Sequence, residues 1–203
     1  MRDKSDTIYF MELVVLVDEQ NNVLGTASKD TVHGRNTPLH RAVSLFLFNS
    51  KKELLLTKRA STKKTFPGIW TNTICGHPAP GESEVDAAMR RLKAELGIEG
   101  SDRSKGSGLE GFKGLTQTRT ASIRVVATYR YRFADKNGIV ENEICPILVG
   151  FTDTNPTPNS SEVSDWKWVR WEDFLEEIKI NPSSYSPWSI EEAHILEEKK
   201  LVQ

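Results

Sequence analysis

The chain has 203 residues, and its 27 basic and 28 acidic side chains leave almost no net charge. This length suits one globular domain over residues 1–203, with a core at about 8–202, and the charge balance excludes a broad electrostatic attraction to nucleic acid. The start of the chain is polar, and no apolar run approaches the ~20 residues that span a membrane. Two cysteines are too few for a disulfide framework. We therefore expect a soluble, cytoplasmic protein without a membrane partner.

Two pairs of strands are predicted in the first third of the chain. The apolar runs Met11–Val17 and Val23–Ala27 are separated by polar residues, which is typical of a hairpin. The run Ala42–Phe48 is almost continuously apolar, and this favours a strand buried on both faces. A polar turn then leads into a further strand over Glu53–Lys58.

A helix is predicted to begin after Ser83, which is a plausible N-cap with Asp86 as its capping partner three residues later. Gly97 is well placed to end this helix. Apolar residues at three- and four-residue spacing predict the buried stripe of the helix, which consists of Val85, Ala88, Met89, Leu92 and Leu96.

The following segment, residues 100–121, is rich in glycine, serine and charged residues and is expected to be a surface loop or insertion. Period-two alternation then predicts a strand, and Asn137-Gly138 indicates a hairpin turn into a strand over Ile139–Phe151. Pro146 in that strand favours a bulge or an edge position. The residues expected to share one face of the first strand are Ile123, Val125, Ala127, Tyr129, Tyr131 and Phe133.

Three shorter elements are predicted at the end of the chain. These are a strand over Trp166–Val169, a helix over Asp173–Ile178 and a last helix from Pro187 to about Leu201. No internal repeat and no linker divides the chain. We therefore expect a single α+β domain in which a mixed β-sheet packs against helices.

Histidines and a pair of glutamates are candidate metal ligands. Glu141 and Glu143 lie two residues apart on a predicted strand, so their carboxylates point to the same side, and two like charges at that distance favour a bound cation. Together with His33, His40 and His77 they would suit Mn²⁺, Zn²⁺ or Mg²⁺. Spacing alone leaves open a second interpretation, in which these are surface histidines and a solvated Glu-x-Glu pair. The fourth histidine, His194, lies on a charged helix and is expected to be exposed.

Cys75 has three interpretations from the residues alone. It could be a small buried hydrophobic residue, or part of a zinc site with His77 and Cys145, although the usual paired spacing of zinc ligands is missing. It could also be a reactive thiol, whose pKa a nearby metal or arginine would have to depress. No role follows for Cys145.

The region around Cys75 resembles a known family. The segment Thr71–Pro78 looks like the cysteine motif of the type I isopentenyl diphosphate isomerases, which belong to the Nudix superfamily, and Gly138–Glu143 looks like their glutamate motif. Between the two lies a modified Nudix box, in which the pattern's glutamates are replaced by Arg91 and Ala94. The resemblance runs from about Asp30 to Trp188. Residues that match the box are Gly76, Glu82, Arg90, Leu92, Glu95, Gly97 and Ile98.

The resemblance implies an acid and a base on opposite sides of an alkene. Glu143, with Tyr131 nearby, would deliver a proton to the terminal carbon, and Cys75 would remove the C2 proton as thiolate. Trp188 would face the intermediate carbocation with its π system. The same resemblance implies one divalent metal ion held by His33, His40, His77, Glu141 and Glu143. Taken singly, Tyr131 and Trp188 fit ordinary packing positions equally well.

The resemblance also implies a diphosphate site. Glu95 would bind Mg²⁺ that bridges the diphosphate oxygens, with Cys75 beside it. The basic residues placed on the phosphates are Lys29, Arg59, Lys63 and Arg91. Without the resemblance, the basic segment around Arg59 would be a solvated loop, and Glu82 would be an acidic residue near a helix N-terminus or a supporting contact.

The residues and the resemblance together leave three functions to be tested. The first is isomerisation of isopentenyl diphosphate to dimethylallyl diphosphate by a monomer or weak homodimer, with Mg²⁺ and one further divalent metal. The second is a conventional Nudix pyrophosphohydrolase, although Arg91 and Ala94 remove carboxylates that hold the catalytic metals of such enzymes. The third is a metal- or phosphate-binding module without catalysis.

Overall fold

The computed structural model describes residues 12–102 and 120–202. Its strands join one mixed sheet, with helices on both sides. In the described part of the chain, no helix is long and apolar enough to cross a membrane. The elements are β1 (Leu13–Val17), β2 (Val23–Ser28), α1 (Lys29–Val32), β3 (His40–Arg41), β4 (Val43–Phe48), β5 (Glu53–Arg59), β6 (Trp70–Thr71), β7 (Ile74–Gly76), α2 (Glu84–Leu96), β8 (Glu99–Asp102), β9 (Thr120–Ala134), β10 (Val140–Phe151), β11 (Val163–Arg170), α3 (Trp171–Ile180), the 3-10 turn η2 (Pro182–Ser184) and α4 (Pro187–Glu198).

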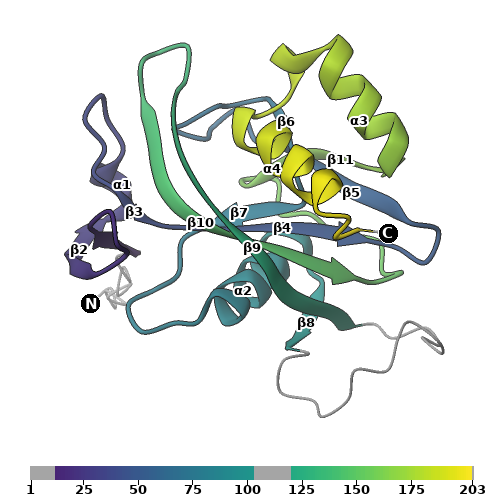
Figure 1. Ribbon diagram of the computed structural model, residues 1–203, viewed down its shortest axis with the longest axis horizontal. Coiled ribbons are helices and arrows are strands. Elements are labelled where there is room, and N and C mark those ends of the chain that lie inside the picture. Colours follow the sequence, from purple (N-terminus) through teal and green to yellow (C-terminus); the bar gives the residue numbers. More distant parts are fainter. Residues whose placement is uncertain (1–11, 103–119, 203) are drawn as a thin grey trace, which may run out of the picture.

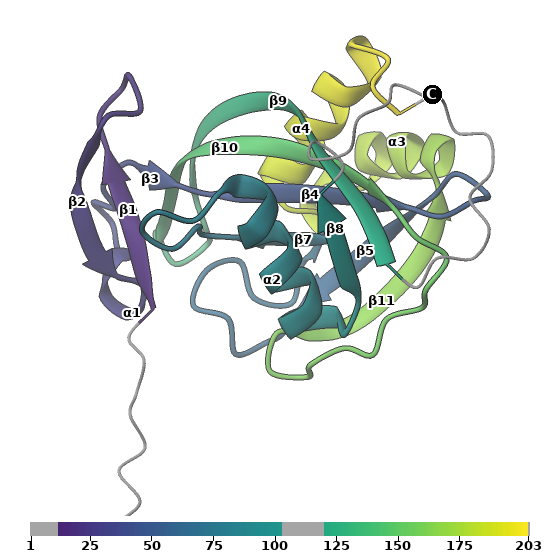
Figure 2. The same cartoon turned by 90° about the horizontal axis from the view of Figure 1, so that it is seen from below.

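Strand β10 is the organising strand of the sheet. It pairs in parallel with β3 and then β4 along one edge, and antiparallel with β9 along the other. The order of strands across the sheet is β11-β5-β4-β10-β3-β1-β2. The predicted mixed sheet is therefore confirmed, and the β1–β2 hairpin forms one end of it, as Figure 2 shows.

Helices cover the two faces of the sheet, with α2 on one face and α3 and α4 on the other (Figure 1). Strand β4 shows why: Leu45 and Leu47 pack in the cluster below α2, whereas Phe46 and Phe48 pack in the cluster below α3 and α4. Every residue of β4 is buried, which confirms the prediction of a strand buried on both faces. At roughly 1.5–3 kcal/mol per buried large apolar side chain, these two clusters are the main source of stability.

Helix α2 has the predicted beginning and end. The Ser83 side chain accepts a hydrogen bond from the Asp86 backbone N–H, and Gly97 ends the helix in the left-handed conformation with φ of 66°. The predicted apolar stripe packs against the sheet as expected. A side chain at position 97 would meet Thr157 Oγ1 at 2.3 Å, so glycine is required for space as well as conformation.

The prediction that six residues of β9 share one face is wrong, because a β-bulge reverses the alternation of side chains along this strand. Ala127 pairs with Ile147 and Val125 pairs with Leu148, so Val126 is an extra residue that reverses the alternation. Ile123 consequently packs below α2, Val125 is exposed, and Tyr131 faces α4. Val125 and Val126 are both ordinary strand residues, so no residue type in the sequence indicated the bulge.

Pro146 lies near a bulge, as predicted, but not at an edge, because β10 is paired on both sides. The proline lies where β3 ends and β4 begins, so its missing N–H coincides with an interruption of the ladder. The predicted loop over residues 100–121 lies mostly outside the described residues. Its two ends differ from the prediction, because residues 100–102 and 120–121 belong to strands β8 and β9, which pair in parallel over residues 99–102 and 120–123.

Candidate active site

A cavity of about 210 Å³ opens between the β1–β2 end of the sheet, α2 and α4. The predicted site residues line it, with the exception of His40 and Glu95, which are buried. They come from distant parts of the chain: Lys29 from α1, Cys75 from β7, Arg91 from α2 and Trp188 from α4. The fold thus brings together the residues that the sequence singled out.

The sheet itself assembles the histidine and glutamate cluster. Glu143 on β10 is the direct neighbour of His40 on the parallel strand β3. His33 follows α1 and His77 follows β7. The five candidate ligand atoms, from His33, His40, His77, Glu141 and Glu143, all lie within 4.8 Å of one another.

Hydrogen bonds prepare this cluster for a cation. His40 Nδ1 lies 2.9 Å from the Pro38 carbonyl oxygen, to which it can only donate, so a neutral His40 carries its lone pair on Nε2. His33 Nε2 and Glu141 Oε2 are 3.0 Å apart, yet neither has a hydrogen-bond partner of good geometry in the described part of the chain. Buried polar atoms without partners are costly, and a divalent ion would satisfy them together. The residues present therefore fit a metal ion.

The charges of the cluster are strongly coupled. Burial by itself would raise the pKa of Glu143, but the adjacent His40 and His77 imidazoles outweigh it and hold this pKa well below its usual range. Burial lowers the pKa of His77 despite the neighbouring carboxylate. His40 differs: burial would lower its pKa, but Glu143 and the Pro38 carbonyl keep it raised. An ionised Glu143 beside a neutral His77 is the protonation state that metal binding requires, whereas a protonated His40 would have to release its proton when a metal ion binds.

The Cys75 sulfur lies at the other side of the cavity and has three polar neighbours. The Trp188 indole N–H donates to Sγ at 3.1 Å, Sγ donates to Asn72 Oδ1 at 3.1 Å, and Ser44 Oγ lies 3.6 Å away. Burial, followed by the charge of Glu192, raises the pKa of Cys75 to about 12. The expected depression of this pKa is thus absent, and Cys75 is a thiol here. Cys75 and Cys145 are both unpaired.

Aromatic rings join the two sides of the cavity. The Trp188 ring stacks on Tyr131 with a centroid distance of 6.0 Å and an interplanar angle of 13°. Tyr131 is the cross-strand partner of Glu143, and its hydroxyl donates a hydrogen bond to Glu143 Oε2. Trp188 therefore contacts both the Cys75 sulfur and the Tyr131–Glu143 pair.

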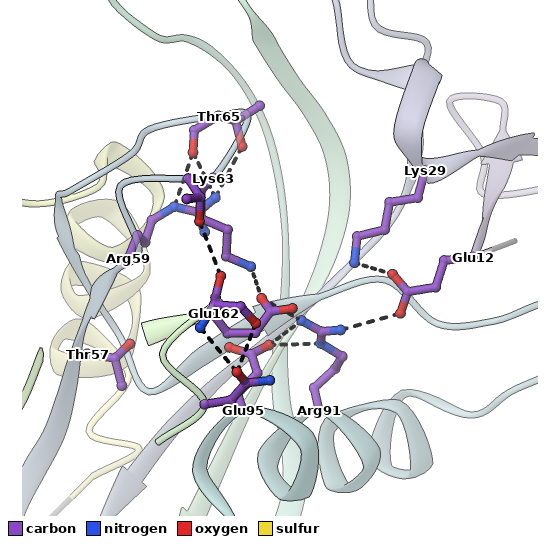
Figure 3. A network of polar contacts seen from close by, with 12 residues as sticks. Glu12, Lys29, Thr57, Arg59, Lys63, Thr65, Arg91, Glu95 and Glu162 are labelled. Carbon is purple, nitrogen blue, oxygen red and sulfur yellow. Dashed lines mark hydrogen bonds and ion pairs between the residues drawn. The ribbon is translucent and has the colours of Figure 1, made fainter. Parts of the chain in front are cut away.

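A network of paired charges forms the third side of the site (Figure 3). Arg91 binds Glu95 at 2.7 Å and Glu162 at 3.2 Å, and it reaches Glu12 at 3.4 Å. Lys63 pairs with Glu162, and Lys29 pairs with Glu12. Burial would lower the pKa of Arg91, but the surrounding carboxylates keep it raised. Each of these predicted phosphate-binding cations already has a carboxylate partner.

Local geometry holds two arginines in place. The Arg59 guanidinium donates to the carbonyl oxygens of Thr65 at 2.8 Å and Phe66 at 3.1 Å, and it lies 5.5 Å from the Trp188 ring centroid. Gly76 lets Arg91 approach β7, since a Cβ there would lie 2.9 Å from Arg91 Cγ.

Several residues that shape the site were missed by the sequence analysis. Thr65 Oγ1 donates to Glu141 Oε1 at 2.5 Å, and Glu162 and Glu12 pair with the cations. None lies in a motif. Glu192 could have been found, because it continues the four-residue spacing from Trp188 to the buried Leu196 and is therefore a carboxylate on a buried helix face. Glu82 accepts from Ala79 N–H and Arg90, which is a supporting contact, and His194 is exposed as predicted.

The fold and the altered helix box define the class of protein. Residues 38–189 match the NUDIX domain family, so the chain is a Nudix-domain protein. Its fold is similar to that of DR0079 from Deinococcus radiodurans, with a TM-score of 0.66 and 20% identity over 90% of this chain and 98% of that one. A MutT protein from Methanosarcina mazei Go1 gives a TM-score of 0.57 and 16% identity over 80% of this chain and 96% of that one.

Sequence relatives narrow the class. A protein of Saccharopolyspora erythraea is 43% identical over 88% of this chain and 82% of its own length, and one of Mycolicibacterium vanbaalenii is 41% identical over 92% of each. An Escherichia coli O17:K52:H18 protein is 40% identical over 94% of each. All three are named isopentenyl-diphosphate Delta-isomerase. The chain belongs to this family, which confirms the resemblance of the two motifs.

Proposed function

We propose that this chain interconverts isopentenyl diphosphate and dimethylallyl diphosphate. The observation that carries the proposal is that Trp188 contacts Cys75 on one side and the Tyr131–Glu143 pair on the other, within one cavity. A proton donor, a proton acceptor and an aromatic face are thus gathered around a space of small-molecule size. Such a set matches the movement of a double bond by addition and removal of protons.

In the proposed reaction, the Glu143–Tyr131 pair delivers a proton to the terminal alkene carbon. Because Glu143 is ionised, this proton is the one that Tyr131 donates to it, and the pair is left with one more negative charge. The resulting tertiary carbocation lies against the Trp188 ring, an interaction worth about 0.5 to 2 kcal/mol. Cys75 acts as thiolate: its own proton first passes to water, and the sulfur then takes the C2 proton and becomes a thiol again. The carbocation is an opposite charge beside the sulfur, so it favours the ionised thiol that burial disfavours.

The remaining residues would hold the substrate and the metals. Lys29, Arg59, Lys63 and Arg91 line the cavity and would bind the diphosphate. Glu95, which is paired with Arg91 and is not part of the lining, would hold the Mg²⁺ of the substrate together with Cys75. The five-residue cluster would hold Mn²⁺, Zn²⁺ or Mg²⁺, which when bound would supply positive charge beside Glu143. The proposal includes a single domain over residues 1–203 that works in the cytoplasm, where two unpaired thiols persist.

The test is NMR of isopentenyl diphosphate incubated with the protein and Mg²⁺ in D₂O. We expect deuterated dimethylallyl diphosphate from the wild-type chain and a loss of at least about 10²-fold in rate for Cys75→Ala, because the base is removed. Cys145→Ala is the matched control, since it makes the same change at the other buried cysteine and should retain turnover.

Three outcomes would overturn the proposal. Turnover that survives Cys75→Ala unchanged would exclude the assigned base. Release of phosphate or nucleotide from a panel of nucleoside diphosphate derivatives, without isomerisation, would favour a Nudix hydrolase instead. Tight metal binding without any turnover of prenyl diphosphates would favour a binding module.

A further inference from the structure

Glu192 is a fully buried carboxyl group behind Cys75 that the proposed chemistry does not use. It lies on α4 one turn after Trp188, so the helix presents both residues to the same side of the sheet. No ion pair of Glu192 occurs among residues 12–102 and 120–202. A carboxylate in such surroundings would be costly, and burial raises the pKa of Glu192 to about 8.

Ser44 connects Glu192 with the reactive sulfur. It is the cross-strand neighbour of Cys75, and its Oγ lies 2.5 Å from Glu192 Oε2 and 3.6 Å from Cys75 Sγ. Asn72 Nδ2 donates a hydrogen bond to Ser44 Oγ at 2.9 Å. A serine hydroxyl has one proton, so Ser44 can donate to the carboxyl group or to the sulfur, but not fully to both.

The protonation of Glu192 decides between these two directions. An ionised carboxylate only accepts, and therefore draws the Ser44 proton away from Cys75. A neutral carboxylic acid can donate to Ser44 Oγ, and the Ser44 proton is then free to turn toward the sulfur. Ionised Glu192 also opposes a thiolate by charge repulsion.

We propose that Glu192 is a positioning residue which, as a neutral acid, turns the Ser44 hydroxyl toward Cys75 and so stabilises the sulfur when it is ionised. This inference rests on the proposed isomerase function. The thiolate would then receive hydrogen bonds from Ser44 and from the Trp188 indole. Hydrogen bonds to an ionised group are about twice as strong as neutral ones, so the direction of one hydroxyl matters for the rate.

The groups that face Glu192 support a neutral acid. They are Cys75 from β7, Cys145 and Glu143 from β10, and Tyr129 and Tyr131 from β9. Thiols, phenols and a second carboxylate do not stabilise a negative charge by ion pairing. Hydrogen bonds with Ser44 and Cys145 lower the pKa of Glu192, but burial outweighs them. Glu192 Oε1 is buried without a hydrogen-bond partner of good geometry, which again disfavours the ionised form.

The pH dependence of kcat tests the inference. The wild-type chain should lose activity as the pH rises through about 8, because Glu192 ionises and turns Ser44 away. Glu192→Leu should lower kcat about tenfold, and Glu192→Gln should restore most of it, because the amide N–H donates permanently to Ser44. In Glu192→Gln the decline near pH 8 should disappear. KM should change little, since Glu192 does not touch the phosphate-binding residues.

Ser44→Ala supplies the second half of the test. This substitution should lower kcat about tenfold. In the Ser44→Ala background, Glu192 and Glu192→Gln should give the same kcat at each pH, which a double-mutant cycle measures. Infrared difference spectra of the resting protein should show a protonated carboxyl band at pH 7 that is missing in Glu192→Gln. This second readout needs no turnover.

The outcomes separate this inference from the proposed function. An active wild-type chain whose decline near pH 8 is identical in Glu192→Gln would overturn the role of Glu192 alone, as would the absence of the carboxyl band at pH 7. A wild-type chain without isomerisation at any pH would overturn the proposed function and this inference with it.

Discussion

The two charged regions of the cavity are built in opposite ways. The histidine and glutamate cluster is fixed largely by the sheet, with Glu143 between its neighbours His40 on β3 and Tyr131 on β9. The cation network instead joins a helix to loops, and Arg91 and Lys63 are held by carboxylates from other segments. One region has buried acceptors that need a cation, and the other has cations that are already neutralised.

This difference indicates which region can adjust. Strand-borne groups are positioned by backbone pairing, so a lost ligand leaves a buried charge or lone pair that nothing else can reach. Lys29 and Lys63 are partly exposed and can exchange a carboxylate for a phosphate at a modest change in energy, because such ion pairs contribute only about 0–1 kcal/mol, whereas Arg91 and Glu95 form a buried pair. We therefore expect substitutions in the cluster to be severe and those in the network to be graded.

The largest effect is expected for Glu143→Gln. The change removes a proposed metal ligand and the carboxylate of the proposed proton-donating pair, so kcat should fall about 10³-fold and metal affinity at least about tenfold. Steady-state kinetics and Mn²⁺ titration by calorimetry measure the two losses. Glu176→Gln, an exposed position on α3, is the control. Unchanged Mn²⁺ affinity would show that the cluster is not a metal site.

An intermediate effect is expected for Arg91→Ala. Loss of a guanidinium that is proposed to bind the diphosphate should raise KM about ten- to hundredfold, with a smaller effect on kcat, because hydrogen bonds to charged groups contribute about 1.5–3 kcal/mol. Lys93→Ala changes a cation on the same helix whose one ion pair within residues 12–102 and 120–202 is with exposed Glu99, and it should leave KM unchanged. A lower kcat at constant KM would instead place Arg91 in the chemical step.

The smallest effect, with the opposite sign, is expected for Glu162→Gln. Its carboxylate competes with the diphosphate for Lys63 and Arg91, so its removal should lower KM about two- to threefold. The gain should shrink at high ionic strength, where exposed ion pairs are screened. A higher KM would mean that Glu162 orients the cations rather than competing for them, and the contrast between the two regions would weaken.

The sequence predicted most of the elements because their signals are local. Ser83 and Gly97 mark the ends of α2, and the apolar run of β4 predicts burial on both faces. The bulge at Val126 had no such signal, since its position depends on the register with β10.

The site was predicted by its motifs rather than by geometry. Residue spacing could not show that His33 and Glu141 meet, because their contact depends on the parallel pairing of distant strands. The partners of the cations, Glu12 and Glu162, lie outside every motif and are known only from the fold. Glu192 could be predicted only in part, because helical spacing indicates that it is buried but not that it lies near Cys75.

The parallel pairing of β3 with β10 has a consequence for the order of folding. Its two strands lie far apart in the sequence, and contacts of that kind form slowly because a long loop must close first. The cluster is completed only when this closure has occurred, so partly folded chains cannot offer all five ligands to an ion. A divalent metal ion added during refolding should therefore slow unfolding more than it accelerates folding. Only a chain in which β3 and β10 are correctly paired would then be able to hold the ion with all five proposed ligands.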